Sequence, residues 1–187
     1  MFTKRNRMTA AICVCALLAV EHVCATIVTP AEFSELVSAA RAIAHGRIVG
    51  IRAQSSDDRV RVETLVTMQV ATYLKGNLGP DVTFVVPGGT LGRYRSIILG
   101  APHFVEGEEV VVFLGARGPS LPYVLRFGQG IFRVVRDSSS EDRMIAPPPL
   151  VGQSQEWQTV VRGDPTRGPM SLTDFAARVR VLVEGGR

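Results

Sequence analysis

Two histidines, His45 and His103, are the side chains beyond residue 25 that are best suited to acid–base or metal chemistry near neutral pH. A metal site needs three or four ligands, often with two histidines at short spacing. These two are predicted to lie on different elements, and the nearest carboxylates, at 106–109, on a turn. We therefore predict no metal site and no cofactor. Because His45 alternates with Ile43 and Arg47, it is expected to be a strand residue near the core or at its rim.

Motifs of nucleophilic catalysis are missing from the sequence. It contains no G-x-S-x-G, no S-x-x-K and no H-E-x-x-H. We therefore predict no catalytic residue. A Ser-His-Asp triad is recognised by geometry and not by spacing, so a hydrolase that uses His45 or His103 remains an alternative. Such an enzyme needs a polar cluster that converges on a histidine in a pocket.

The segment Gly88–Arg95 (GGTLGRYR) is the strongest candidate for ligand binding. Its glycines can expose backbone N–H groups, Arg93 and Arg95 can hold an anion, and Tyr94 can stack on a ligand. No helix is predicted to follow, and the Lys-Ser/Thr pair of a phosphate loop is missing. We therefore predict a loop that contacts an anionic ligand or a protein through these three side chains.

Strands must position these residues, since alternation with a period of two is the strongest pattern in the chain. Valine, threonine and methionine side chains share one face of a strand over 60–70, and mostly polar residues share the other. A strand of this length bends or coils, which favours a closed barrel over a flat sheet. Further strands are predicted at 43–51, 82–86, 110–114, 123–127, 131–135 and 144–146, with 110–114 buried on both sides and a bulge or sharp bend at 128–130.

Two helices flank the strands. Thr29 and Glu32 match a capping box, which predicts a helix that starts there and ends near Ala40. A second helix is predicted from Ser171 to Gly185. The predicted fold is mainly β (α+β), a small antiparallel OB-like barrel with an N-terminal and a C-terminal helix, and a β-sandwich is the alternative.

Several turn and strand motifs resemble a family of uncharacterised exported bacterial proteins. They are Tyr73–Gly76 (YLKG), Val86–Thr90 (VPGGT), Phe104–Leu114 (FVEGEEVVVFL) and Gly130–Val134 (GIFRV), within a similarity that covers about 35–136. The resemblance implies an exported domain and no particular activity. The strand order is also similar to the OB-type barrel of netrin modules and tissue inhibitors of metalloproteinases. Those inhibitors chelate zinc through an N-terminal cysteine, which this chain lacks, so the second similarity implies architecture alone.

The first 25 residues match a cleavable signal peptide. A basic start is followed by an apolar run over 8–20, shorter than the ~20 residues of a membrane-spanning helix, and by Val23-Cys24-Ala25. Cleavage after Ala25 is predicted to leave a secreted or periplasmic protein that begins at Thr26 and has no membrane span. It removes all three cysteines, three basic residues and one acidic residue, so the net charge falls from +4 to +2. The remaining arginines are dispersed, so nucleic acid is not an expected partner.

Three segments are predicted after the signal peptide: a β-barrel domain with its N-terminal helix over 26–146, an irregular segment over 147–170, and the C-terminal helix over 171–187. The predicted function is that of an exported, non-enzymatic binding or interaction domain with an unknown ligand. The alternatives are the extracytoplasmic hydrolase described above and a structural, envelope-associated protein.

Overall fold

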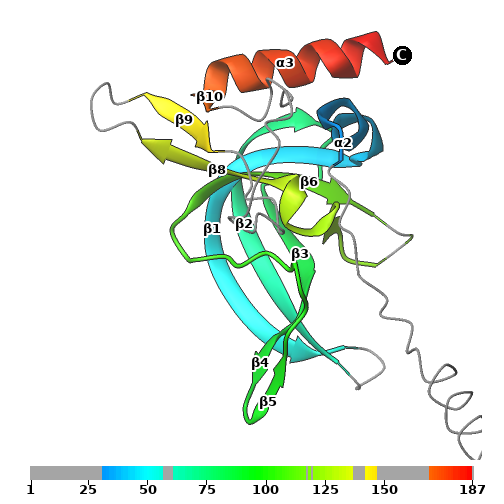
Figure 1. Cartoon of the computed structure of the whole chain (residues 1–187), viewed down its shortest axis with the longest axis vertical. Helices are drawn as coiled ribbons and strands as arrows, with labels where there is room; N and C mark the ends of the chain where they lie inside the picture. Colours follow the sequence, from blue (N-terminus) through cyan, green and yellow to red (C-terminus); the bar gives the residue numbers. More distant parts are fainter. Residues whose placement is uncertain are drawn as a thin grey trace, which may run out of the picture.

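The computed structural model describes residues 31–56, 61–116, 118, 120–136, 142–146 and 169–186. Strands dominate them, with one helix near each end of this part of the chain (Figure 1). The elements are α2 (Phe33–Ala39), β1 (Ala42–Ser55), β2 (Val62–Lys75), β3 (Asp81–Pro87), β4 (Gly89–Leu91), β5 (Tyr94–Ser96), β6 (Glu109–Gly115), β7 (Tyr123–Val124), the 3₁₀ turn η1 (Phe127–Gly130), β8 (Ile131–Arg136), β9 (Arg143–Ala146), β10 (Met170–Ser171) and α3 (Leu172–Gly185). None of the helices within these ranges is long and apolar enough to cross a lipid bilayer.

A ring of five strands forms the barrel. The eight-stranded sheet has the order β1-β2-β3-β7-β6-β8-β9-β10, and an additional pairing of β1 with β6 closes its first part into a ring. Every pairing in the ring is antiparallel except that of β3 with β7, which is parallel. A five-stranded, partly open ring is the architecture of OB-type barrels. The predicted OB-like barrel is therefore confirmed, and the β-sandwich is not the fold.

The closure depends on a bend in β1. The first half of this strand pairs with both β2 and β6, and the second half continues with β2 alone. The register against β2 shifts between His45 and Gly46, as at a β-bulge. A Cβ atom at Gly46 would lie 2.2 Å from the carbonyl oxygen of Gln69, so only glycine allows the two strands to approach this closely.

The interior of the barrel is mostly aliphatic. On β2, Val66 and Met68 are completely buried, as the alternation predicts, and β3 contributes Val82, Phe84 and Val86. Val60 of the same predicted face lies outside the described residues. Phe84 and Phe104 meet edge to face with their ring centroids 5.5 Å apart. The predicted inner faces of β2 and β3 are therefore correct.

Strand β6 is shared between two apolar cores. Val110, Val112 and Leu114 face the barrel interior, whereas Val111 and Phe113 face the opposite way, toward the helices. All five side chains are completely buried, which confirms the prediction of a strand covered on both sides. Without an outer layer of helices, the second face of β6 would be exposed to water.

The outer core is aromatic at its centre. Phe33 of α2, Phe113 of β6, Phe132 of β8 and Phe175 of α3 make ring contacts with one another, with centroids 4.9–6.4 Å apart. Ser171 caps α3 by accepting a hydrogen bond from the backbone N–H of Asp174 at 3.0 Å, as a helix start at this residue requires. The predicted second helix is thus present, with Gly186 at its C-terminal cap.

Three local predictions are wrong. The N-terminal helix starts at Phe33 and not at Thr29, because Glu32 has an extended backbone and makes no side-chain cap. The strand predicted over 123–127 stops at Val124, since Arg126 and Phe127 have positive φ values of 49° and 53°. Gly128, Gln129 and Gly130 then belong to the 3₁₀ turn η1, where a bulge or sharp bend was predicted. The predicted signal peptide (1–25) lies outside the described residues, and so do residues 147–168 of the predicted irregular segment (147–170).

Candidate functional site

The predicted binding segment forms a β-hairpin. Strands β4 and β5 pair antiparallel with Gly89 opposite Ser96 and Leu91 opposite Tyr94, and Gly92 turns the chain with φ 57°. In Figure 1 this hairpin lies at the end of the molecule opposite α3. The sequence analysis treated the segment as a connecting loop, so the hairpin is a finding of the structure.

The base of the hairpin is fixed to β2. The backbone N–H of Gly88 donates to the carbonyl of Val62 at 3.0 Å, and the hydroxyl of Thr64 donates to the carbonyl of Gly88 at 2.8 Å. Gly89 has φ 141°, and a Cβ atom on it would lie 2.5 Å from the Thr64 hydroxyl. The two glycines of the VPGGT motif are therefore needed where the hairpin crosses β2.

A cleft of about 600 Å³ lies between the hairpin, the segment that follows it and the barrel strands. Most of its walls are apolar, with Val66, Val86 and Phe104 contributed by the barrel and its flank and Ile97 and Ile98 by the segment after β5. Its other lining residues are Ile51, Ala53, Thr64, Pro87, Gly88, Gly89, Thr90, Arg95, Ser96, Ala101, Pro102 and His103. No carboxylate lines the cleft in the described part of the chain, so its charged chemistry is cationic.

The three predicted contact residues do not share one surface. Arg95 lines the cleft, whereas Arg93 and Tyr94 lie at the hairpin turn and contact each other. The Arg93 guanidinium carbon lies 5.3 Å from the centroid of the Tyr94 ring, and Nη2 of Arg93 donates to the Tyr94 hydroxyl at 3.2 Å. Arg95 is therefore the only one of the three in position to meet a ligand in the cleft.

His103 also lines the cleft. Its side chain is exposed, and its backbone carbonyl accepts a hydrogen bond from Nη2 of Arg133 at 2.6 Å. Nε of the same arginine donates to Oε2 of Glu108 at 3.2 Å. The side chain of Arg133 therefore connects β8 to two positions, 103 and 108, of the segment that precedes β6. The position of the cleft wall is thus set from strand β8.

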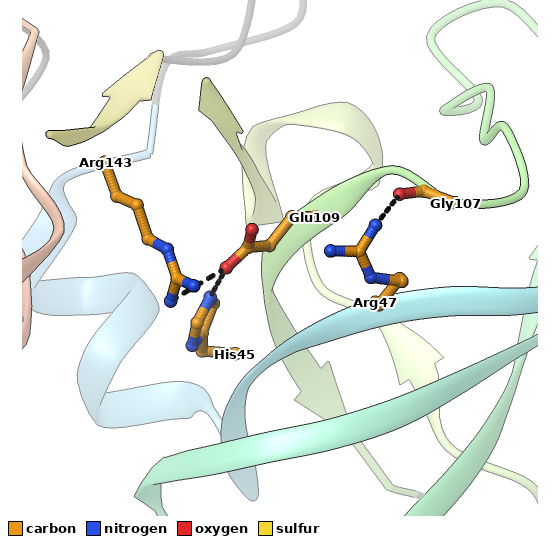
Figure 2. Close-up of polar contacts among 5 residues, drawn as sticks. All are labelled: His45, Arg47, Gly107, Glu109 and Arg143. Carbon is orange, nitrogen blue, oxygen red and sulfur yellow. Dashed lines mark hydrogen bonds and ion pairs between the residues drawn. The ribbon is translucent and has the colours of Figure 1, made fainter. Parts of the chain in front are cut away.

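A polar cluster lies around His45, in the first half of β1 (Figure 2). Its Nε2 lies 2.7 Å from Oε1 of Glu109, and the same oxygen lies 3.3 Å from Nη1 of Arg143. His45 is 6% exposed, which confirms a strand histidine at the rim of the core. Glu109, predicted on a turn, is the first residue of β6. The cluster joins β1, β6 and β9 at one carboxylate.

This cluster has part of the chemistry of a general base, since a carboxylate orients the imidazole. No serine or threonine hydroxyl is hydrogen-bonded to His45 among the described residues. Arg47 points away from it, toward Gly107, whose carbonyl accepts from Nη1 of Arg47 at 2.8 Å. A hollow of about 370 Å³ lies beside the cluster and is lined in part by Glu109 and Arg143, but not by His45. The geometry is that of a structural tie between strands.

Sequence reasoning missed this pairing and the cleft. Both depend on which strands are neighbours, because β1 and β6 are far apart in the chain and His45 lies opposite Val111 across the barrel seam. The residues that the structure describes contain no group of three His, Cys, Asp or Glu side chains arranged to hold a metal ion.

Comparisons with protein-family models, with curated proteins and with solved structures found no match to this chain. The resemblance to exported bacterial proteins therefore remains a prediction from the sequence motifs. The functional argument rests on the cleft, the hairpin and the His45 cluster.

Proposed function

We propose that this chain is an exported, non-enzymatic binding domain that holds an amphipathic, anionic ligand in the cleft beneath the β4–β5 hairpin. The observation that carries the proposal is the lining of that cleft: apolar walls, two cationic or titratable side chains, and no carboxylate among the described residues. An apolar group would contact the walls, and an anionic group would meet Arg95.

The size of the cleft suits a small organic molecule. Ligand pockets typically enclose about 300–1,000 Å³ and are lined mainly by apolar side chains with a few polar groups. At about 600 Å³, this cleft lies in the middle of that range. Val66 and Phe104 belong to the barrel core, so the cleft lies directly over rigid structure.

The charge of the cleft favours an anion. The guanidinium group of arginine keeps its charge at every physiological pH and matches the geometry of carboxylate and phosphate. Arg95 and His103 both line the cleft, one on β5 and one in the segment before β6. A ligand with one anionic end and one apolar end would satisfy both parts of the lining.

Export is part of the proposal. It is supported by the signal-peptide pattern of residues 1–25, with its basic start, its short apolar core and Val23 and Ala25 at the −3 and −1 positions of the predicted cleavage site. A ligand met outside the cytoplasm would enter the cleft directly from the medium or from the envelope.

The hydrolase is the weaker hypothesis. Its best observation is the contact of His45 with Glu109, but His45 is almost completely buried and does not line the cleft. His103 does line the cleft, and its backbone carbonyl accepts a hydrogen bond from Nη2 of Arg133. A hydrolase would lose turnover of a test ester on His103→Gln, whereas the binding domain proposed here has no turnover to lose.

The test measures binding of 1-anilinonaphthalene-8-sulfonate, an anionic aromatic dye whose fluorescence rises in apolar sites. It uses the protein recovered from outside the cytoplasm, which we expect to begin at Thr26. We expect decanoate to displace the dye and decanol to displace it far less well. Arg95→Gln should weaken decanoate binding about tenfold, since a hydrogen bond to a charged group contributes roughly 1.5 kcal/mol.

The matched control is Arg180→Gln, which removes an exposed arginine from α3, far from the hairpin in Figure 1. It should bind decanoate as the unchanged protein does. Equal affinity for decanoate in the Arg95→Gln variant, or equal displacement by decanol and decanoate, would show that no anion is recognised in the cleft.

A further inference from the structure

The two histidines among the described residues have opposite surroundings. His45 is buried, and its Nε2 lies 2.7 Å from a carboxylate oxygen of Glu109. His103 is exposed and lines the cleft together with Arg95. No ion pair or hydrogen bond joins its imidazole to a carboxylate within the part of the chain that the structure describes. The imidazole of His103 is therefore free to meet a ligand in the cleft.

The backbone of His103 is held in place by its neighbours. Its carbonyl accepts a hydrogen bond from Nη2 of Arg133 at 2.6 Å, and Nε of Arg133 donates to Oε2 of Glu108 at 3.2 Å. The next residue, Phe104, is 5% exposed and packs against Phe84 in the barrel core. The backbone that carries the imidazole is thus fixed at the cleft, which lowers the entropy lost when a ligand orders the side chain.

The glutamates that follow His103 in the sequence have other partners. Oε1 of Glu106 accepts a hydrogen bond from the backbone N–H of Ile51 at 3.2 Å. Oε1 of Glu108 accepts one from the backbone N–H of Val105 at 2.8 Å, and its Oε2 accepts from the guanidinium described above. Neither glutamate lines the cleft. An anion in the cleft therefore meets the histidine without a competing carboxylate in the lining.

The charged groups around the cleft determine the sign of its pH dependence. Among the described residues, Arg95 is the other charged side chain of the lining. The strands packed around the cleft carry further charged side chains that do not line it: Arg47 and Arg52 on β1, Glu63 on β2 and Arg133 on β8. Histidine side chains gain a positive charge as the pH falls from about 8 to about 5, and that charge attracts an anion. By linkage, a bound anion favours the proton on His103 as much as the proton favours the anion.

We propose that His103 is a second, proton-dependent contact for the anionic end of the ligand, so that the cleft binds more tightly as the pH falls. The inference rests on the proposed function, since it concerns the same cleft and the same class of ligand. Arg95 attracts the anion at every physiological pH, and the imidazolium of His103 adds a second charge-assisted hydrogen bond in mildly acidic solution. An exported protein would thus hold its ligand in acidic surroundings and release it as they become neutral.

The experiment is isothermal titration calorimetry of the protein recovered from outside the cytoplasm with decane-1-sulfonate, an amphiphile whose anionic group does not titrate in this range. We expect its affinity to be about tenfold higher at about pH 5.5 than at about pH 8, the effect of one hydrogen bond to a charged group. Titrations at about pH 6.5 in two buffers with different heats of ionisation should show that binding takes up protons. Circular dichroism at each pH checks that the fold is unchanged.

Two variants at position 103 separate charge from structure. His103→Gln should bind equally at both pH values, with the affinity of the unchanged protein at the higher pH. His103→Arg carries a fixed charge and should keep the higher affinity at both. Equal affinity of the unchanged protein at the two pH values, or a pH dependence that survives in His103→Gln, would overturn the inference.

A comparison with decanol separates this inference from the proposed function. If the pH dependence is absent but decane-1-sulfonate still binds better than decanol, the cleft recognises anions through Arg95 and the role of His103 is wrong. If decane-1-sulfonate binds no better than decanol at either pH, the proposed function fails and the inference fails with it.

Discussion

The two ends of this molecule treat apolar side chains in opposite ways. At the helix end, α2 and α3 cover Phe113 and Phe132 of the sheet, and every ring of the phenylalanine cluster is at most 5% exposed. At the hairpin end, Tyr94 is 62% exposed and Leu91 is 38% exposed. Both ends contain large apolar residues, so the two ends differ in how far these residues are covered.

The difference between the two ends indicates which apolar residues stabilise the fold and which are available for binding. Burial of large apolar side chains is the main source of stability, so the helix end is where substitutions should unfold the protein. Exposed apolar side chains contribute little to folding, and their presence at the hairpin end indicates a surface that meets something else. The next three predictions test this division from the helix end to the hairpin end.

The largest effect is expected at the shared strand. Phe113→Ala removes a ring that is completely buried and contacts Phe33, Phe132 and Phe175. Such a change typically lowers the free energy of unfolding by about 3–5 kcal/mol, through lost burial and the cavity left behind. Urea denaturation followed by circular dichroism measures it. Leu99→Ala, a change at a large apolar residue that is 76% exposed on the segment after β5, should alter the same quantity by less than about 0.5 kcal/mol.

A cost comparable to that of Phe113 for Leu99→Ala would contradict the division between buried and exposed apolar side chains. It would mean that the side chain of Leu99 contributes to folding and that its exposure is not a sign of function.

An intermediate effect is expected at Lys75, which ties β2 to the end of α2. Its Nζ donates to the carbonyls of Val37 at 2.7 Å and Ser38 at 3.0 Å, satisfying oxygens that the helix leaves unpaired. Lys75→Met keeps the length of the side chain and loses both bonds. The free energy of unfolding should fall by about 1–2 kcal/mol, since hydrogen bonds to a charged group contribute this much.

The pH dependence of the Lys75 contribution has a definite sign. Burial lowers the pKa of the ammonium group below its ordinary value of 10.5. Between the lowered pKa and 10.5 the unfolded chain binds more protons than the folded one, so stability rises with pH in that window. The gap between the unchanged protein and Lys75→Met should therefore widen as pH rises toward 10.5. A narrowing gap would mean that the two carbonyls raise the pKa instead.

The smallest effect is expected at the hairpin turn. Replacing Arg93, Tyr94 and Arg95 together by alanine should change the free energy of unfolding by no more than about 0.5 kcal/mol, because the side chains are exposed. Thermal denaturation measures this. The same variant should lose decanoate affinity through Arg95. A large loss of stability would show that the arginine stems pack over the end of the barrel.

The features that were predictable from sequence are those set by neighbouring residues. Alternation placed Val66 and Met68 in the core, and the unbroken apolar run of β6 indicated two buried faces. The serine at 171 marked a helix start correctly because its cap bond lies within the same turn. Each of these depends on contacts within a few positions of the chain or on burial alone.

The features that could not be predicted depend on contacts between residues far apart in the sequence, or on tertiary packing that overrides a local pattern. Thr29 and Glu32 match a capping box, yet Glu32 keeps an extended backbone and the helix starts at Phe33, whose ring packs into the outer core. Glu109 was assigned to a turn because its partner His45 lies across the barrel seam. The cleft has no sequence pattern, since its walls come from β1, β2, β3 and the hairpin.

The structure predicts that the backbone amides of strand β6 exchange their hydrogens with solvent most slowly. Both of its faces are covered by side chains, and its two edges are bonded to β1 on one side and to β7 and β8 on the other. Its backbone amide hydrogens can therefore exchange with solvent deuterium only when barrel and helices separate together, whereas those of the hairpin exchange by local opening. The slowest amides of this chain thus report the lifetime of the whole fold, and the hairpin can move many times within that lifetime.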